Sequence, residues 1–274
     1  MKKRLLLAFS IFTLGMLAGI LFQKQQGVWK IKMVLHDLAP LSWKREHTST
    51  DSLPKERLMV ALAFGQSNSA NFGQGAKRAR KGVYNFYQNK LYHAEDPMLG
   101  ADGPGASTWP RLGDLLIASK QYDNVVFASI GISATSISRW QPNGNLHSTL
   151  LSTLQSLKQN GLTVTHLLWH QGESDAVLKT SKDDYKNSFK KMLESIREQG
   201  VNAPIYVSIA SRYKNHPKNN SIRKAQIELV QQDHSILSGP DSDQLGEGFR
   251  RDGTHFTSTG LDRLAQLWLN CLVQ

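Results

Sequence analysis

The chain has 274 residues, of which 40% are hydrophobic, so it can form one domain with a packed core or two small ones. Its formal net charge of +11 favours an anionic partner such as nucleic acid, a membrane surface or an acidic glycan. The positive charges are scattered, however, and zinc-finger spacings, glycine-rich phosphate loops and RNA-binding strand motifs are all missing from the sequence. A nucleic-acid-binding protein is therefore disfavoured.

The first residues resemble a membrane-targeting segment. Basic residues 2–4 precede residues 5–22, which carry no charge and would span ~27 Å as a helix, close to the thickness of a hydrocarbon core. A small-x-small cleavage pattern is missing after Gly19, and Ile20 stands where a lipoprotein needs Cys. We therefore predict an N-terminal anchor in residues 1–22, with the rest of the chain in the periplasm or another extracytoplasmic space. Cleavage of this segment would instead give a secreted protein.

Residues 23–56 mix charges, Pro and Trp without a sustained period and are predicted to form a stalk or linker. From residue 57 onward, apolar runs alternate with helical patterns. The predicted strands are 58–64, 124–130, 165–170 and 204–210, and the predicted helices lie near 109–120, 146–160, 181–199, 220–232 and from 258. Strands that are apolar on both faces and alternate with helices predict an α/β domain over residues 57–274, a three-layer α/β/α sandwich around a parallel sheet. The last helix carries the single cysteine, Cys271, which excludes an intrachain disulfide and is expected to be buried.

Polar segments rich in small residues follow the predicted strands. They read Gly65-Gln66-Ser67-Asn68, Gly131-Ile132-Ser133-Ala134, Gln171-Gly172-Glu173-Ser174-Asp175 and, before the last helix, Asp252-Gly253-Thr254-His255. In an open parallel sheet, sites form beyond the carboxyl ends of the strands, so these segments are expected at one edge.

This set of residues is typical of a serine hydrolase. A serine hydroxyl needs a base to take its proton, and the base is usually a His oriented by a carboxylate. Ser67 is the candidate nucleophile, His255 the base and Asp252 its partner, three residues away in one turn. Backbone N–H groups of Ser67 and of the 131–134 turn, and the Gln171 amide, are candidate donors to a developing oxyanion.

Together these motifs resemble the SGNH hydrolases, and most of all the branch of sialate O-acetylesterase-like and acetylxylan-esterase-like carbohydrate esterases. The resemblance covers residues 57–274. It implies a flavodoxin-like fold and hydrolysis of O-acetyl esters on a glycan, without a metal or other cofactor. It assigns Ser67, His255 and Asp252 to the triad and Gln171 to the oxyanion site. The family's backbone donor is usually a Gly, whereas the matching position here is Ala134, with Gly131 as the alternative.

Other interpretations of the same residues remain open. His166 and His170 are four apart and could bind a metal if they lay on a helix, but the residues between them favour a strand. Glu173 and Asp175 could form a glycosidase pair, although a buried acceptor role that holds the loop is favoured for Glu173. Residues 139–144 could form a sugar platform or simply pack the loop. A lipase or thioesterase and a non-catalytic glycan-binding module are the alternative functions, and neither the sugar nor the oligomeric state can be read from the sequence.

Overall fold

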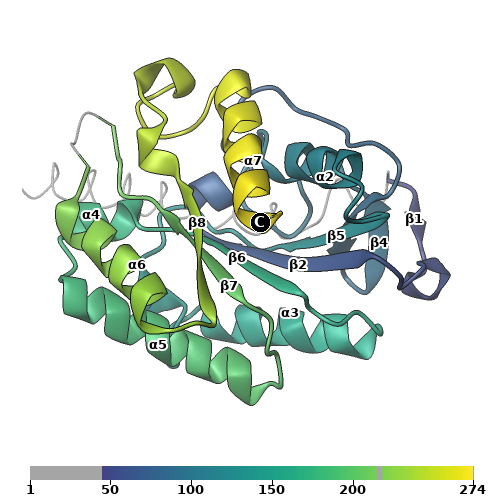
Figure 1. Ribbon diagram of the computed structural model, residues 1–274, viewed down its shortest axis with the longest axis horizontal. Helices are drawn as coiled ribbons and strands as arrows, with labels where there is room; N and C mark the ends of the chain where they lie inside the picture. The colour runs from purple at the N-terminus through teal and green to yellow at the C-terminus, as the bar shows by residue number, and fades with distance from the viewer. Residues whose placement is uncertain (1–44, 215–217, 274) are drawn as a thin grey trace, which may run out of the picture. The chain divides into compact units, whose positions relative to one another are not determined.

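A single eight-stranded sheet organises the part of the chain that the computed structural model describes, residues 45–214 and 218–273. The spatial order of the strands is β1-β4-β3-β5-β2-β6-β7-β8 (Figure 1). Among these strands only β4 runs against the others, pairing antiparallel with both β1 and β3. The bounds are β1 His47–Thr48, β2 Leu58–Gly65, β3 Val83–Tyr87, β4 Lys90–His93, β5 Asn124–Ser129, β6 His166–His170, β7 Ile205–Ile209 and β8 Ile236–Asp241.

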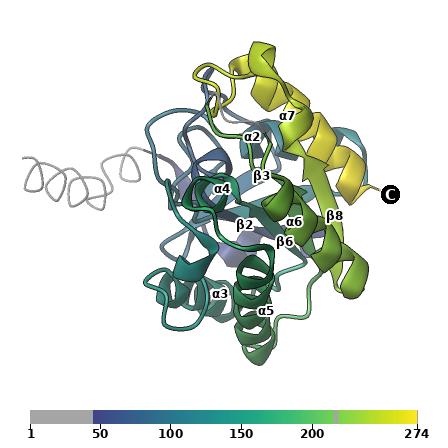
Figure 2. The same ribbon diagram turned by 90° about the vertical axis from the view of Figure 1, so that its left-hand side faces the viewer.

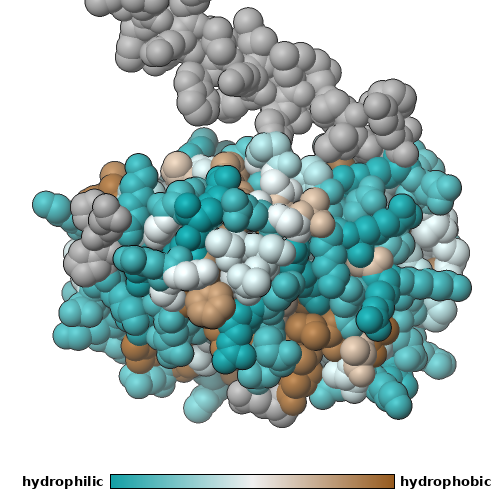
Figure 3. Space-filling model, turned by 90° about the horizontal axis from the view of Figure 1, so that it is seen from above, coloured by the Kyte–Doolittle hydropathy of each residue, from teal (hydrophilic) through white to brown (hydrophobic). Residues whose placement is uncertain are grey.

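Helices cover both faces of this sheet. The α-helices of the described residues are α2 Trp109–Ala118, α3 His147–Gln159, α4 Glu173–Leu178, α5 Lys182–Glu198, α6 Asn220–Gln232 and α7 Ser258–Leu272. Figures 1 and 2 show α2 and α7 on one face and α3, α5 and α6 on the other. The face that carries α2 and α7 is mostly hydrophilic, with isolated apolar side chains (Figure 3). The predicted three-layer α/β/α sandwich is therefore confirmed.

The central strand β2 shows why the sequence forms this fold. Alternate residues of a strand point to opposite faces, so a strand buried on both sides must be apolar throughout. Val60, Leu62 and Phe64 enter the core beneath α3, α5 and α6. Met59, Ala61 and Ala63 enter the core beneath α2 and α7. Because both cores need these side chains, the register of β2 is fixed, and with it the position at which the strand ends.

The predicted elements agree with the structure to within two residues wherever the pattern was regular. The four predicted strands are β2, β5, β6 and β7, and the five predicted helices are α2, α3, α5, α6 and α7. The prediction missed β3, β4, β8 and the short helix α4. The predicted parallel sheet comprises β3, β5, β2, β6, β7 and β8, and the missed strand β4 runs against its neighbours β1 and β3. Cys271 is half-buried rather than buried.

The end of the predicted linker belongs to the folded domain. His47 and Thr48 pair with β4, and Leu53 is buried in a core, so this part of the predicted linker contacts the domain. The hydrophobic run that led to the anchor prediction, residues 5–22, lies outside the described residues. Among the described residues, none of the helices is both long enough and apolar enough to cross a membrane.

Candidate active site

The ends of β2, β5 and β6 bring the predicted site segments to one edge of the sheet, which faces the viewer in Figure 2. Ala63 of β2 is in register with Ser129 of β5, and Gly65 with His170 of β6. Gly65 has a φ of +132°, and a Cβ there would lie 2.1 Å from the His170 carbonyl oxygen. Only glycine allows the two backbones this close, so Gly65 lets the loop that carries Ser67 begin directly against β6.

Ser67 opens a short 3₁₀ turn, residues 67–69, immediately after β2. The turn is closed by hydrogen bonds from the Ser69 N–H to the Gln66 carbonyl (2.8 Å) and from the Ala70 N–H to the Ser67 carbonyl (3.1 Å). Ser67 is only 4% exposed, yet its hydroxyl retains contact with solvent and has no hydrogen-bond partner among the described residues. The hydroxyl is thus held in place by its backbone and is free to react.

Asp252 and His255 form a hydrogen-bonded pair within one turn. The Asp252 carboxylate accepts from His255 Nδ1 at 2.7 Å through one oxygen. The other oxygen accepts the backbone N–H groups of His255 (2.7 Å) and Thr254 (3.0 Å). Burial raises the pKa of Asp252, but these hydrogen bonds outweigh it and hold the pKa at about 2. The ionised carboxylate therefore fixes the tautomer in which His255 Nδ1 is protonated and Nε2 can accept a proton.

The nucleophile turn and the His255 turn lie against each other. The side-chain amide of Asn68 donates to the Thr254 carbonyl at 3.3 Å, and the Phe72 ring stacks on the His255 ring with centroids 5.3 Å apart. Within the described residues, Ser67 and His255 are not joined by a hydrogen bond. Such bonds are often long in unliganded enzymes and tighten in the substrate complex. The structure thus brings the predicted nucleophile and base onto adjoining loops.

Two backbone positions compete for the second oxyanion donor. Gly131 packs directly on the nucleophile turn, because a Cβ there would lie 2.8 Å from the carbonyl carbon of Ser69. Ala134 is exposed and adopts the left-handed φ of +55°, which is strained for a residue with a Cβ. Neither the Gly131 nor the Ala134 N–H has an acceptor among the described residues.

Gln171 does not fit the oxyanion role expected for it. Its side chain is fully buried, and its amide nitrogen already donates to the Thr135 carbonyl (2.9 Å) and to the Asp175 carboxylate. Its oxygen accepts from the Tyr185 hydroxyl at 3.0 Å. Because an amide has only two N–H donors, both are used inside the protein. Gln171 therefore holds neighbouring loops together in this structure.

The neighbouring amide, Gln66, has the properties that Gln171 lacks. Its oxygen accepts from the backbone N–H groups of Ser174 (3.0 Å) and Gly172 (3.3 Å), which fixes which end of the amide faces α4. Its nitrogen has no acceptor among the described residues and keeps contact with solvent. The amide is thus oriented by its carbonyl and leaves its N–H groups available beside Ser67. Gln66 belongs to the motif Gly65-Gln66-Ser67-Asn68 but has no predicted role of its own, and its position next to Ser67 was the sequence signal that could have made it a candidate.

The remaining candidates of the sequence analysis are structural. His166 and His170 lie on the strand β6, where residues four apart are ~13 Å apart, too far to share one metal ion. His170 is fully buried, which lowers its pKa to about 3, and both ring nitrogens lack a hydrogen-bond partner within the described part of the chain. Glu173 and Asp175 are also buried, so they cannot flank a sugar as a glycosidase pair does. Glu173 accepts from the Asn68 amide at 2.6 Å, which confirms that it holds the loop.

Trp140 is likewise no sugar platform. Its side chain is fully buried against Phe64 and Trp169, with ring centroids 5.9 and 5.7 Å away. Its indole N–H donates to the Thr135 hydroxyl. Trp140 therefore packs the loop after β5 onto the core.

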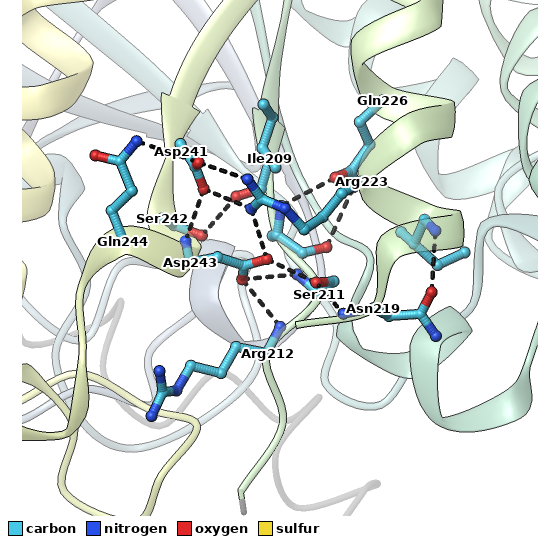
Figure 4. A network of polar contacts seen from close by, with 12 residues as sticks. Ile209, Ser211, Arg212, Asn219, Arg223, Gln226, Asp241, Ser242, Asp243 and Gln244 are labelled. Carbon is cyan, nitrogen blue, oxygen red and sulfur yellow. Dashed lines mark hydrogen bonds and ion pairs between the residues drawn. The ribbon is translucent and has the colours of Figure 1, made fainter. Parts of the chain in front are cut away.

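The loop after β7 forms the border of the site on the side of α6. Figure 4 shows that Asp243 anchors it by accepting from the Ser211 hydroxyl (2.6 Å) and the Arg212 N–H (2.9 Å), while Arg223 pairs with the same carboxylate. Farther along, the Lys214 N–H donates to the Thr254 hydroxyl at 2.9 Å, so this loop also supports the His255 turn. A cavity of about 350 Å³ lies between this loop and α4. Its lining combines small polar groups with two lysines: Ala176, Val177, Lys179, Ser211, Tyr213, Lys218, Asn219 and Asn220.

Solved structures with the same fold are distant in sequence. A protein of Arabidopsis thaliana superimposes with a TM-score of 0.64 at 14% identity, covering 78% of this chain and 96% of its own. NanS gives a TM-score of 0.56 at 13% identity, with coverages of 81% and 98%. The acetylxylan esterase Axe2 of Geobacillus stearothermophilus gives 0.53 at 11% identity, with coverages of 81% and 96%. At these identities the likeness shows a shared fold.

A family model identifies the chain more closely. Comparison with curated proteins yields no significant match. The model of the family described as "Carbohydrate esterase, sialic acid-specific acetylesterase" matches residues 57–274, the full extent of the predicted catalytic domain. The chain therefore belongs to this family of carbohydrate esterases.

Proposed function

We propose that the chain removes O-acetyl groups from a carbohydrate through a serine esterase mechanism, with Ser67 as nucleophile, His255 as base and Asp252 as its partner. The observation that carries the proposal is the Asp252–His255 pair, 2.7 Å apart, on a loop hydrogen-bonded to the residue that follows Ser67. Because the ionised Asp252 carboxylate accepts the proton on Nδ1 in a hydrogen bond, the other ring nitrogen of His255, Nε2, can act as a proton acceptor. Ser67 supplies the nucleophile of the first step.

In the first step the Ser67 hydroxyl oxygen attacks the acetyl carbonyl carbon, while His255 Nε2 takes the hydroxyl proton. The tetrahedral intermediate then expels the sugar oxygen, to which His255 returns the proton, and an acetyl-enzyme remains. In the second step water attacks the acetyl carbonyl with His255 again as base. Breakage of the bond to Ser67 releases acetate and restores the serine hydroxyl.

The oxyanion that forms in both steps needs donors on one side of Ser67. The Ser67 N–H and one N–H of the 131–134 turn supply two, and the Gln66 side-chain amide supplies the third. The bonding of Gln66 and Gln171 supports this assignment, because the Gln66 carbonyl is anchored by Ser174 while both N–H groups of Gln171 are occupied. Gly131 is favoured over Ala134 as the backbone donor because it lies against the nucleophile turn.

The remainder of the glycan extends, in this proposal, from the site toward the cavity between α4 and the loop after β7. Its polar groups and the lysines Lys179 and Lys218 suit hydroxyl and acidic groups of a sugar. The overall charge of +11 is consistent with an acidic glycan. The proposed location is the extracytoplasmic side of a membrane, with residues 5–22 as the anchor, where acetylated surface glycans are accessible.

The decisive test compares Ser67→Ala with Ser69→Ala in the full chain. Acetate release is measured from 4-nitrophenyl acetate and from a panel of acetylated glycans. Ser69 lies in the same turn, is fully buried, and has a hydroxyl without a partner, so its loss should leave turnover nearly intact. We expect Ser67→Ala to abolish turnover without changing the urea midpoint. Equal turnover by Ser67→Ala and the parent would refute the proposal that Ser67 is the nucleophile. The relative rates on the acetylated glycans of the panel identify the preferred sugar.

A further inference from the structure

A single side chain links the nucleophile turn to the turn that carries the base. Asn68, which directly follows Ser67, is 5% exposed and donates from one amide nitrogen to two acceptors. They are the carbonyl of Thr254, which directly precedes His255 (3.3 Å), and the carboxylate of Glu173 (2.6 Å). The two turns are 186 residues apart in sequence. A small movement of this amide would therefore change the separation between the nucleophile and the base.

The Thr254 carbonyl is held from the opposite side as well. The guanidinium of Arg250 donates to it, and the other guanidinium nitrogens donate to the carbonyls of Leu245 (2.9 Å) and Ser242 (2.7 Å). Arg250 thereby fixes the His255 turn to its own segment of the chain. Asn68 provides the contact from the nucleophile side, and Glu173 determines the position of Asn68.

The carboxyl group of Glu173 is unusually buried for one whose only side-chain hydrogen bond among the described residues comes from the Asn68 amide. It is 1% exposed, and one of its two carboxylate oxygens has no partner among the described residues. A buried carboxylate normally has a full set of donors, because burying it unpaired is costly. A structural acceptor for Asn68 would need only one carbonyl oxygen, which a glutamine supplies without charge. The presence of a carboxyl group here calls for a role that depends on its charge.

We propose that Glu173 and Asn68 are positioning residues for the esterase reaction, and that the ionised form of Glu173 is the one that holds Ser67 at the working distance from His255. This inference rests on the proposed roles of Ser67 and His255. A hydrogen bond to a carboxylate is shorter and about twice as strong as one to a neutral acceptor. Protonation of Glu173 therefore loosens Asn68, and with it the contact to Thr254.

The surroundings of Glu173 set the pH at which this change occurs. Burial raises the pKa of Glu173 to about 7, and the hydrogen bond from Asn68 opposes that rise. Arg250 lowers the pKa and Asp243 raises it, while Tyr185 of α5 stays protonated because burial and nearby carboxylates raise its own pKa. His170 on β6 stays neutral near this pH, since burial lowers its pKa to about 3. Glu173 is thus the buried group of this set that titrates near neutral pH.

The consequence is a steeper loss of activity on the acid side. As the pH falls through about 7, Glu173 takes up a proton and the parent enzyme comes to resemble a variant with a neutral group at this position. Glu173→Gln keeps a carbonyl acceptor for Asn68 but cannot titrate. The ratio of kcat/KM between the parent and Glu173→Gln should therefore fall from roughly ten at high pH to about one at low pH.

The test measures kcat and KM for 4-nitrophenyl acetate from pH 5 to 9 with the full chain, Glu173→Gln, Asn68→Ala and the double variant. We expect each single variant to lower kcat roughly tenfold at high pH, with KM nearly unchanged, since a charge-assisted hydrogen bond is lost. The double variant should be no slower than Asn68→Ala, because both residues act through the same contact. Where Glu173→Gln does not fold, Asn68→Ala carries the test, since the ratio of kcat/KM between the parent and this variant should change with pH in the same direction.

The matched control is Glu228→Gln, the same chemical change in a carboxylate that pairs with Lys182 and Lys186 between α5 and α6. It should retain the parent kcat at every pH of the series. Single variants within twofold of the parent kcat at high pH, a ratio of parent to Glu173→Gln that does not change with pH, or additive losses in the double variant would each overturn the proposal. These outcomes are distinct from failure of the proposed function, which would show as turnover by Ser67→Ala.

Discussion

The buried carboxyl of Glu173 also makes a prediction about stability that does not depend on catalysis. Burial raises its pKa from an ordinary value of 4.5 to about 7, so the folded protein binds a proton at Glu173 more tightly than the unfolded chain does. The free energy of unfolding then includes a contribution that is fully present below pH 4.5 and is lost as the pH rises through 7. At 1.36 kcal/mol for each pKa unit, the contribution amounts to about 3 kcal/mol.

This contribution is isolated by comparing the parent protein with Glu173→Gln. Urea denaturation at half-unit intervals from pH 4 to pH 8.5 gives the free energy of unfolding of each. Other titrating groups, such as His166, whose pKa burial lowers to about 4, are common to both proteins and cancel in the difference. We expect the stability of Glu173→Gln relative to the parent to increase by about 3 kcal/mol between pH 4.5 and pH 8.

The constant cost of placing an amide at residue 173 shifts this difference curve as a whole without changing its shape. The prediction therefore concerns the change with pH, not the absolute difference. A difference curve that stays flat within 0.5 kcal/mol, on the order of the error of such comparisons, would show that Glu173 does not titrate between these values. The reasoning about its charge would then be wrong, even if the residue still holds Asn68.

Two further predictions concern the groups around Ser67. Gln66→Ala should lower kcat roughly 10²–10³-fold in steady-state kinetics, as loss of an oxyanion donor does. The matched variant Gln171→Ala should mainly lower the urea midpoint. The reverse pattern would show that Gln171, not Gln66, donates to the oxyanion. Asp252→Asn should lower kcat by up to about 10⁴-fold, because an amide no longer fixes the tautomer of His255. A loss of less than tenfold would show that His255 is oriented without Asp252.

The layers of the fold could be predicted because they depend on simple patterns. The apolar runs of β2, β5, β6 and β7 follow from burial on both faces, and the helices between them follow from their periodicity. The strands β3 and β4 were missed for a physical reason. They are joined by Gln88 and Asn89, both with positive φ, in a two-residue turn that usually carries Asn-Gly or Asp-Gly. Without the glycine, the sequence gives little indication of a hairpin.

The site could be predicted only as far as it depends on sequence order. Asp252 and His255 are three residues apart, so their hydrogen bond is a local property of one turn. The choice between Gln66 and Gln171 is different. It depends on which acceptors the fold brings to each amide, and the ones that occupy Gln171 include the Thr135 carbonyl, 36 residues away in sequence. Residue type and spacing cannot distinguish a free amide from an occupied one.

The segment after β6, residues 171–175, positions the neighbouring loops. Its buried side chains reach the loops on either side: Gln171 bonds the Thr135 carbonyl after β5, Asp175 accepts from the Ile137 N–H (2.8 Å), and Glu173 accepts from Asn68 after β2. None of these contacts involves Ser67 or His255 directly. The groups proposed to react lie on two loops, and this third segment fixes where those loops lie. Its substitutions should therefore change kcat through geometry, even though each lies behind the surface that the substrate meets.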